Sequence, residues 1–498
     1  MEHEERYDVV IAGGGNAGFS AAHAAREAGA SVLLLEKAPA SEAGGNSYYT
    51  AGAFRFPHNG LADLAPLLTE PDERLAATTV PPYPEDAFTA DMDRVTGGRT
   101  DPVLARLLVA RAADTVRWLA ALGIRWRLMY ERQAYVSDGS WVFFGGLAVG
   151  TEGGGKGLIA QHTRAAIDAG TEIRYEARVL GLSRRGRTVT GVRYTDGAGA
   201  EHEVTAGAVV LAAGGFEADP ARRERYLGPG WSRALVRGTP GNTGEVLDMA
   251  LEAGAARHGD WSSCHSVAWD AAAPPGGGER RLTNQLTRQS YPLGIVVNTE
   301  GRRFLDEGAD FRNYTYARYG REILRQPGGL AFQLFDARTR PMLRTEEYDS
   351  RPISEQIADT VEDLAAKLGV DPGGLAATVA GFNASIRDVP FDPAVKDGRA
   401  ARTDPPKSNW ALALDTPPYY GYAVACGITF TFGGVHVDPG ARVLDDSGAP
   451  LPGLFAAGEL VGGLFSGNYP GGSGLTAGAV FGRLAGIGAA AAATETPA

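Results

Sequence analysis

Short apolar runs alternate with helical patterns at the start of the chain. Val9, Val10 and Ile11 form a run that is typical of a strand buried on both of its faces. Small residues then recur at helical spacing over 17–28, and residues 32–35 form a second apolar run. This order of strand, helix and strand predicts the beginning of an α/β fold with a parallel sheet.

A glycine-rich turn joins the first expected strand to the helix. Gly13, Gly15 and Gly18 have the spacing G-x-G-x-x-G, which combines a tight turn, close backbone approach to a pyrophosphate and close packing of helix on strand. Glu36 ends the second strand, where an acidic side chain can accept hydrogen bonds from a ribose 2′-OH. Because strand, turn, helix, strand and acid occur in order, we predict a dinucleotide site and not a glycine turn without a ligand.

The pattern further along extends the sheet. Runs with β character between residues 173 and 205 alternate with turns and predict a small antiparallel meander. Residues 208–215 then form another buried parallel strand that ends in glycines. A third parallel strand that returns beside the first after a meander favours an FAD-binding fold over a plain NAD-binding fold.

The composition changes in the second half of the chain. From about residue 260 to 425 the sequence is richer in Trp, Tyr, Pro and charge, and after residue 433 the earlier style returns. The elements expected in the richer stretch are strands at 294–298 and 331–335 and helices at 353–368 and 372–387. We therefore expect a discontinuous FAD-binding domain, formed by 1–259 and 428–498, and an inserted second α+β domain at 260–427.

Composition and charge narrow the classes of function. The 498 residues are too many for one ordinary core, and a net charge of −11 without a basic block argues against a nucleic-acid partner. Cys264 and Cys426 supply neither a disulfide framework nor a C-x-x-C metal motif. The first strand begins within ten residues of Met1, and Arg483 interrupts the Ala-rich C-terminus, so we expect neither a signal peptide nor a membrane span. A cytoplasmic protein with a small-molecule substrate is the expectation.

Taken together, these motifs resemble the FAD-binding domain of the flavoprotein subunits of fumarate reductase and succinate dehydrogenase. The stretches that carry the resemblance are GGGNAG in the first turn, GGNS at 44–47, AAGGF at 212–216, TGE at 243–245 and GLFAAGE at 453–459. The resemblance implies a Rossmann-like domain with a capping insertion. It also implies that Glu459 holds ribityl hydroxyls and that the last helix directs its positive N-terminus at the flavin.

The resemblance gives a set of expected cofactor-binding residues. They are Gly13, Gly15, Asn16, Ala17, Gly18, Glu36, Lys37, Gly44, Gly45, Asn46, Ser47, Val179, Ala213, Gly214, Gly458, Glu459, Gly472, Ser473, Gly474 and Leu475. The succinate dehydrogenase branch attaches FAD covalently through a histidine in the glycine-rich loop, whereas this loop carries Tyr48 and Tyr49. Non-covalent FAD is therefore expected, and no metal.

Three further stretches are most similar to the tricarballylate dehydrogenase branch: GDWSSCHSVAWD, DEGADFRNYTYARYG and GNYPGGSGLTAGAVFGR. The similarity implies dehydrogenation, or reduction, of a C–C bond next to a carboxylate or carbonyl, with hydride transfer to flavin N5. His265 corresponds to the carboxylate-binding histidine of the family, allowing a one-residue gap, and Arg312 lies one position from its proton-transferring arginine. Arg288 and Arg318 are further candidates for holding carboxylates.

Two positions depart from the family pattern. Phe430 stands where the family has a histidine, and Tyr469 stands where it has an arginine. Losing two polar anchors and gaining two aromatic rings indicates a larger or less charged substrate. Tyr469 could then accept the proton in place of Arg312, with Tyr314 and Tyr316 in reserve.

Two other readings of the sequence stay open at this stage. The protein could be a flavin-dependent oxidase or monooxygenase of the same fold, or a non-catalytic flavoprotein subunit for electron transfer. The sequence has no heme C-x-x-C-H motif and no cysteine set for an iron–sulfur cluster. Any protein or quinone-linked electron acceptor is therefore expected to be separate.

Overall fold

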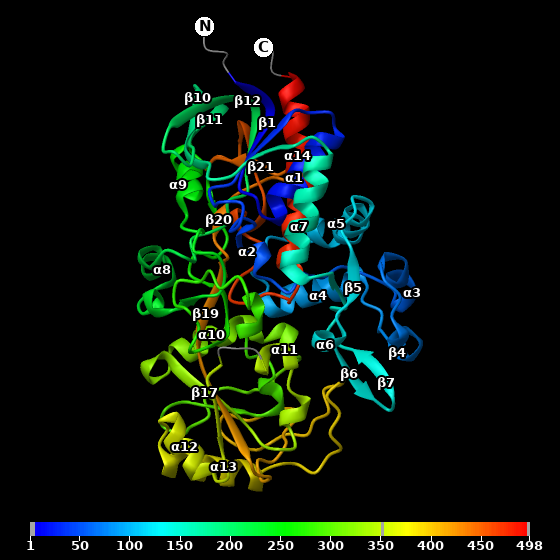
Figure 1. Cartoon of the computed structure of the whole chain (residues 1–498), viewed down its shortest axis with the longest axis vertical. Coiled ribbons are helices and arrows are strands. Elements are labelled where there is room, and N and C mark those ends of the chain that lie inside the picture. Colours follow the sequence, from blue (N-terminus) through cyan, green and yellow to red (C-terminus); the bar gives the residue numbers. More distant parts are fainter. Residues whose placement is uncertain (1–4, 350–352, 496–498) are drawn as a thin grey trace.

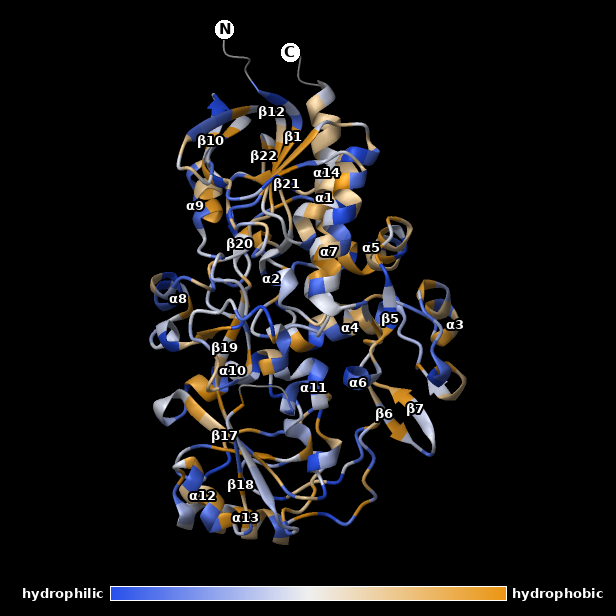
Figure 2. Ribbon diagram, in the orientation of Figure 1, coloured by the Kyte–Doolittle hydropathy of each residue, from blue (hydrophilic) through white to orange (hydrophobic). Residues whose placement is uncertain are grey.

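Two β-sheets organise the chain, and the computed structural model describes residues 5–349 and 353–495. An eight-stranded sheet lies near the two termini, and a six-stranded sheet lies toward the opposite end of the molecule (Figure 1). Figure 2 shows that strands of both sheets carry hydrophobic residues. The mixed α/β class expected from the sequence is confirmed.

The eight-stranded sheet has a parallel core. Its parallel strands lie in the order β22 (Pro450–Ala456), β12 (Glu201–Leu211), β1 (Arg6–Ala12), β2 (Val32–Leu35) and β9 (Glu172–Arg174). Val10 lies opposite Val209 on one side and Leu33 on the other, and all three side chains are fully buried. The apolar runs of the sequence are therefore central strands covered on both faces.

Three helices cover this sheet, and two of them are in very close contact. They are α1 (Asn16–Glu27), α7 (Gly154–Asp168) and α14 (Ser473–Glu495). A Cβ atom at Gly482 would lie 2.4 Å from the carbonyl oxygen of Ala17, and one at Gly486 would lie 2.2 Å from that of Ala21. Only glycine permits this approach of α14 to α1.

The antiparallel meander expected over 173–205 differs from the structure in two respects, the first being that residues 172–174 form β9 and pair parallel with β2. The hairpin of β10 (Arg178–Arg185) and β11 (Thr188–Thr195) pairs with β12, as expected. However, β12 is one continuous strand, antiparallel to β11 along its first half and parallel to β1 and β22 farther on. Residues 201–205 and 208–211 therefore belong to one strand and not to two.

The six-stranded sheet is built around one long strand, β19 (Tyr419–Thr431). The others are β13 (Leu235–Val236), β15 (Cys264–Asp270), β16 (Ile295–Val297), β17 (Leu330–Phe335) and β18 (Glu355–Ala358). The strands expected at 294–298 and 331–335 are confirmed. The sheet extends beyond 260–427 at both ends, so the division into two domains stays a prediction.

The helix expected at 353–368 is wrong in its first part. Residues 355–358 form β18, which pairs antiparallel with β19, and only α12 (Val361–Leu368) is helical. Thr360 caps this helix, because its hydroxyl accepts a hydrogen bond from the backbone N–H of Asp363 at 3.1 Å. Residues 355–358 pair with an edge of β19 that is otherwise free, so they form a strand, and the helix begins only after Thr360. The second expected helix is α13 (Pro372–Ala384).

Residues 53–151 add a lobe that the sequence did not predict beyond its long helix. It contains α4 (Glu85–Thr96), α5 (Pro102–Ala121) and two small sheets. These are formed by β3 (Ala53–Phe54), β5 (Trp126–Leu128) and β8 (Val149–Thr151), and by β4 (Thr78–Thr79), β6 (Ala134–Ser137) and β7 (Ser140–Phe143). Figure 1 shows this lobe beside both large sheets.

The remaining elements are short. They are α2 (Gly45–Tyr48), α3 (Leu61–Leu64), α6 (Tyr130–Gln133), α8 (Pro220–Leu227), α9 (Glu245–Glu252), α10 (Tyr316–Leu324), α11 (Thr345–Tyr348), β14 (Arg257–His258), β20 (Gly434–Val435) and β21 (Arg442–Leu444).

One helix of the described residues, α14, is long and apolar enough to cross a membrane by length and composition. This corrects the expectation that no stretch would reach that length. The helix is mostly buried against α1 and the eight-stranded sheet, and Arg483 on it pairs with Asp114 of α5 at 2.6 Å. Packing inside the fold accounts for its apolar surface.

We expect Gly18→Ala to destabilise the protein. A Cβ atom at residue 18 would lie 1.9 Å from the carbonyl oxygen of Gly13, so α1 would have to move away from the turn. Overpacking of this kind costs about 1–3 kcal/mol. Thermal unfolding checks it against Gly381→Ala, an exposed position in α13 with no atom within 4 Å, where alanine is expected to stabilise slightly. Equal midpoints for the two variants would contradict the packing argument.

Candidate active site

An elongated cavity runs from the turn after β1 to the C-terminal end of β19. It encloses about 2030 Å³, including its open mouth, and is lined by both large sheets, by the loop at 42–51 and by the start of α14. Most of the expected cofactor residues line it. Gly18, Gly44 and Ser473 instead lie behind the lining, where a Cβ at Gly44 would lie 2.9 Å from Ile159 and the Ser473 hydroxyl donates to the carbonyl of Pro470.

The cavity end at β1 has the features of an ADP site. A Cβ at Gly13 would lie 2.5 Å from the carbonyl oxygen of Ala212, whereas a Cβ at Gly15 would make only ordinary contacts, with the hydroxyl of Ser47 at 3.5 Å and the carbonyl oxygen of Gly44 at 3.9 Å. Glu36 accepts hydrogen bonds from the backbone N–H groups of Gly14 at 2.8 Å and Ala38 at 2.9 Å. These two bonds orient the carboxylate and leave acceptor capacity for a ribose hydroxyl.

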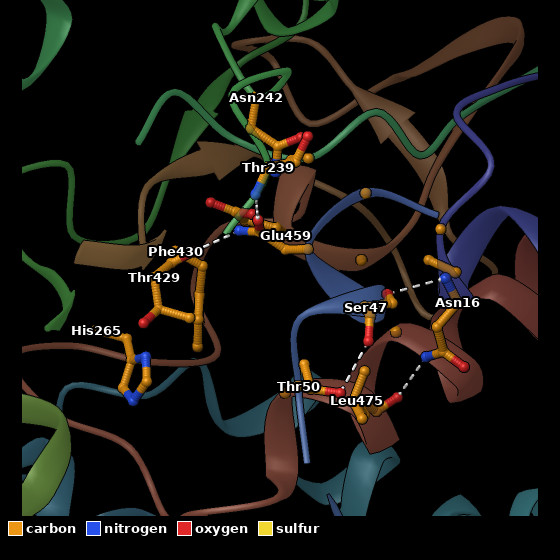
Figure 3. Close-up of a pocket in the computed structure, with 18 of the residues that line it drawn as sticks. Asn16, Ser47, Thr50, Thr239, Asn242, His265, Thr429, Phe430, Glu459 and Leu475 are labelled. Atoms are coloured by element: carbon orange, nitrogen blue, oxygen red, sulfur yellow. Dashed lines mark hydrogen bonds between the residues drawn. The ribbon is translucent and has the colours of Figure 1, made fainter. Parts of the chain in front are cut away.

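Asn16 connects three segments at the middle of the cavity (Figure 3). Its backbone N–H donates to the hydroxyl of Ser47 at 3.0 Å, and its side-chain amide donates to the carbonyl of Leu475 at 2.8 Å. Behind it, His162 Nε2 lies 3.1 Å from the amide oxygen of Asn16, and burial lowers the pKa of this histidine well below its ordinary value. The neutral ring therefore donates to Asn16 and fixes its orientation.

Asn46 connects the glycine-rich loop to the second sheet. Its amide donates to the carboxylate of Glu217 at 2.5 Å and to the carbonyl of Thr429 at 2.5 Å, and its oxygen accepts from the backbone of Thr239 at 2.8 Å. Sequence reasoning missed Glu217, although an acid directly after the AAGGF strand end was an available signal. Burial raises the pKa of Glu217, and the neighbouring carboxyl of Glu459 raises it further.

Glu459 lines the cavity from the strand end after β22. Its carboxylate accepts hydrogen bonds from the backbone of Thr431 at 2.7 Å and from the Thr431 hydroxyl at 3.0 Å. Burial raises the pKa of Glu459 as well. A pair of buried carboxyls with raised pKa values is held most easily when it carries a single negative charge.

At the far end of the cavity, His265 lies among aromatic rings. It belongs to β15 and lies opposite Phe430 of β19, and Figure 3 shows the two side by side. Its ring centroid is 4.8 Å from that of Tyr469 and 5.0 Å from that of Tyr316. Neither ring nitrogen has a hydrogen-bond partner in the described part of the chain. Burial lowers the pKa of His265 well below its ordinary value, and the charge of Arg237 lowers it further. The ring is therefore neutral.

Tyr469 and Tyr316 form a hydrogen-bonded pair. Their phenol oxygens are 2.5 Å apart, and both rings line the cavity. Burial raises the pKa of both, that of Tyr469 well above its ordinary value. Tyr314 has a different environment, since its hydroxyl donates to Asp91 at 2.6 Å and the residue does not line the cavity. Of the two reserve tyrosines, only Tyr316 joins Tyr469.

The arginines divide into those that line the cavity and those that do not. Arg312 lines it, donates to Gln289 at 3.2 Å and to the carbonyl of Arg132, and has a buried Nε without a partner among the described residues. The expected roles of Arg288 and Arg318 were wrong. Arg288 is fully buried in an ion pair with Asp270 at 2.7 Å. Neither Arg288 nor Arg318 lines the cavity.

Sequence reasoning missed Arg237, which does line the cavity. Its only sequence signal was an arginine directly after the short apolar run at 234–236. Together, this end of the cavity offers a phenol pair, a neutral histidine and two guanidinium groups beside an apolar wall. Such a set can hold a carbonyl or carboxylate oxygen and move one proton.

Comparison with known proteins agrees with this geometry. Residues 8–475 match the family model described as "FAD binding domain". "Probable fumarate reductase Ifc3" of Shewanella frigidimarina (strain NCIMB 400) is 31% identical over 98% of this chain and 75% of its own length. "4-oxocyclohexanecarboxylate 2-dehydrogenase" of Sinomonas cyclohexanicum is 30% identical over 96% of this chain and 91% of its own length.

Among solved structures, the open conformation of a flavocytochrome c3 fumarate reductase superposes with a TM-score of 0.73. It is 29% identical and covers 98% of this chain and 79% of its own. The family match spans almost all of the chain, and the relatives are named as reductases and dehydrogenases. The chain belongs to the FAD-binding domain family related to fumarate reductase, and it is an FAD-dependent oxidoreductase that acts on C–C bonds near carboxylates or carbonyls.

Proposed function

We propose that the protein interconverts a CH–CH bond and a C=C bond of a bulky oxo acid, with Tyr469 moving the proton. The observation that carries this is the Tyr316–Tyr469 pair beside the neutral His265 at the end of the cavity. The family pattern of polar carboxylate anchors is replaced there by Phe430 and Tyr469, with Phe465 also in the wall. This wall supports a ring or apolar chain better than a tricarboxylate, so the tricarballylate assignment is the weaker proposal.

The residues along the cavity fit FAD. The glycine turn, the N-terminus of α1 and Glu36 would hold the ADP half, while Asn46, Ser47 and Glu459 would contact the middle of the cofactor. The N-terminus of α14, at Gly474 and Leu475, would face the flavin end. When bound, FAD supplies the two-electron chemistry by accepting or donating hydride.

Tyr469 is better suited than Arg312 to exchange the proton. A guanidinium stays protonated at all ordinary pH values and is a poor proton acceptor. In dehydrogenation, the carbon next to the carbonyl or carboxylate loses a proton to Tyr469 while its neighbour loses hydride. In reduction, Tyr469 returns that proton. Burial raises the pKa of Tyr469 well above its ordinary value and the hydrogen-bonded Tyr316 raises it further, so Tyr469 accepts the proton in its minor phenolate form. The charge of Arg237 favours that form by lowering the pKa of both phenols.

His265 and Arg312 would act on the substrate oxygen. The neutral imidazole has one N–H, and its buried nitrogens lack partners in the described residues, so it can donate to a carbonyl or carboxylate. Donors placed in this way stabilise the enolate-like charge that develops as the proton leaves. Electrons would leave through a separate acceptor, and a cytoplasmic location remains part of the proposal.

The function is tested by anaerobic bleaching of the bound flavin. We expect 4-oxocyclohexanecarboxylate and similar cyclic oxo acids to bleach it faster than succinate or tricarballylate, because the reacting end is walled by rings. Slow reoxidation in air is the expected result for a dehydrogenase, and rapid turnover with oxygen would favour the oxidase reading. The proposal fails if no acid or ketone bleaches the flavin and no unsaturated analogue reoxidises the dithionite-reduced enzyme.

Tyr469→Phe should slow bleaching by the best substrate about 10²–10⁴-fold, the usual contribution of a positioned proton acceptor. Bound flavin is expected to be unchanged, since only a hydroxyl is removed. Tyr314→Phe is the matched control, because it removes a buried phenol outside the cavity. Normal bleaching by Tyr469→Phe would exclude Tyr469 as the base.

FAD should be released on denaturation. The loop beside the cavity places Tyr48 and Tyr49 where the succinate dehydrogenase branch has its attachment histidine. Acid precipitation is therefore expected to leave all flavin absorbance in the supernatant. Yellow colour retained in the washed pellet would show a covalent bond.

A further inference from the structure

Arg237 is held rigidly at the reacting end of the cavity. It follows β13, which pairs parallel with β19, and its backbone N–H donates to the carbonyl of Ile428 at 2.8 Å. Its guanidinium donates to the hydroxyl of Thr429 at 2.7 Å and to the amide oxygen of Asn284. The side chain is thus fixed by the sheet beneath it and by two neutral groups.

Arg237 forms no ion pair with a carboxylate among the described residues, although the charge of Glu347 acts on it from a greater distance and opposes the lowering of its pKa by burial. The residue is 8% exposed, its Nε is buried without a hydrogen-bond partner, and no ion pair within 4.0 Å involves it. Outside the cavity, Arg288 pairs with Asp270 at 2.7 Å and Arg303 with Glu307 at 2.5 Å, whereas the buried Arg223 donates to the backbone carbonyls of Glu217 and Ser232. Arg237 differs from Arg223 because it lines the cavity. Burying an unpaired charge is costly, so a cavity-facing guanidinium without a counter-ion points to an anion that arrives with a ligand.

The position of Arg237 relates it to the reacting groups. It lines the same cavity as His265, Tyr316 and Tyr469, and its charge acts on all three, lowering their pKa values. Thr429, which holds the guanidinium, directly precedes Phe430, the ring that packs on His265 at 5.1 Å. A group bound by Arg237 would therefore lie next to the phenol pair.

We propose that Arg237 binds the carboxylate of the substrate and thereby selects an anionic oxo acid over a neutral ketone. This inference rests on the proposed function, because it places the oxidised bond between that carboxylate and Tyr469. Five N–H donors in a planar fork suit a carboxylate, and the Thr429 and Asn284 contacts leave Nε–H free for it. An oxygen of the flavin ring is another ligand acceptor that the same fork would suit, and the experiment separates the two.

The test compares Arg237→Gln with the wild-type holoenzyme by equilibrium titration, monitored by the change in flavin absorbance. The probes are cyclohexanecarboxylate, which has no ketone, and the methyl ester of 4-oxocyclohexanecarboxylate, which has no charge. We expect the variant to bind the carboxylate about 10–100-fold more weakly, the value of a charge-assisted hydrogen bond. The ester should bind equally to both proteins. Arg318→Gln, at an arginine outside the cavity, should behave like the wild type.

Each outcome decides a separate point. Unchanged affinity for cyclohexanecarboxylate in Arg237→Gln overturns the carboxylate role, even if Tyr469→Phe abolishes bleaching and the proposed function stands. Loss of FAD, or a shifted flavin spectrum before any probe is added, assigns the guanidinium to the cofactor and also overturns it. Weakened carboxylate binding without bleaching by any substrate supports the carboxylate role and refutes the proposed function. Arg237→Lys, which keeps the charge, should recover part of the affinity if the glutamine variant folds poorly.

Discussion

The close approach of backbone to backbone around α1 governs the geometry of the cofactor end. Gly18 allows α1 to start directly on the Gly13 turn, and Gly482 and Gly486 allow α14 to lie against the same helix. Both helices therefore begin at the cavity, α1 at the turn after β1 and α14 beside Tyr469. Two helix N-termini, with their unpaired N–H groups, are brought to a single elongated ligand by contacts between small residues.

Charge is arranged differently at the two ends of the cavity. Near the cofactor middle, Glu217 and Glu459 are buried together, and amide and hydroxyl donors from Asn46 and Thr431 surround them. At the reacting end, the charges are positive and the neighbours are aromatic. In the proposed function, this division would suit a hydroxyl-rich cofactor chain held by acceptors and an oxygen-bearing substrate held by donors.

Local motifs determined which parts of the molecule could be predicted from sequence. Four predicted positions line the cavity as expected: the turn at Gly13, the acid at Glu36 and the strand ends near Gly214 and Gly458. Each lies in a segment whose own residue spacing identifies it as part of a nucleotide-binding motif. Arg237 lines the cavity and Glu217 supports its wall through Asn46 because distant segments meet across β19, and no spacing in the sequence indicates such a contact. Arg288 was predicted to hold a substrate carboxylate but is paired with Asp270 inside the fold, and the sequence around a single arginine does not show that a distant aspartate will neutralise it. The edge of β19 likewise took residues 355–358 away from the helix that their periodicity favoured.

The length of β19 has a mechanical consequence. Its first residues pair with β18 near α12, and its last residues, Thr429 and Thr431, contact Arg237 and Glu459. A hydrogen-bonded strand hardly stretches, so α12 cannot shift relative to the cavity wall without carrying that wall with it or tearing the sheet. The far sheet and this end of the cavity are thus joined through one strand, whereas the lobe at 53–151 contacts α11 through side-chain pairs such as Arg132 with Glu347 at 3.0 Å.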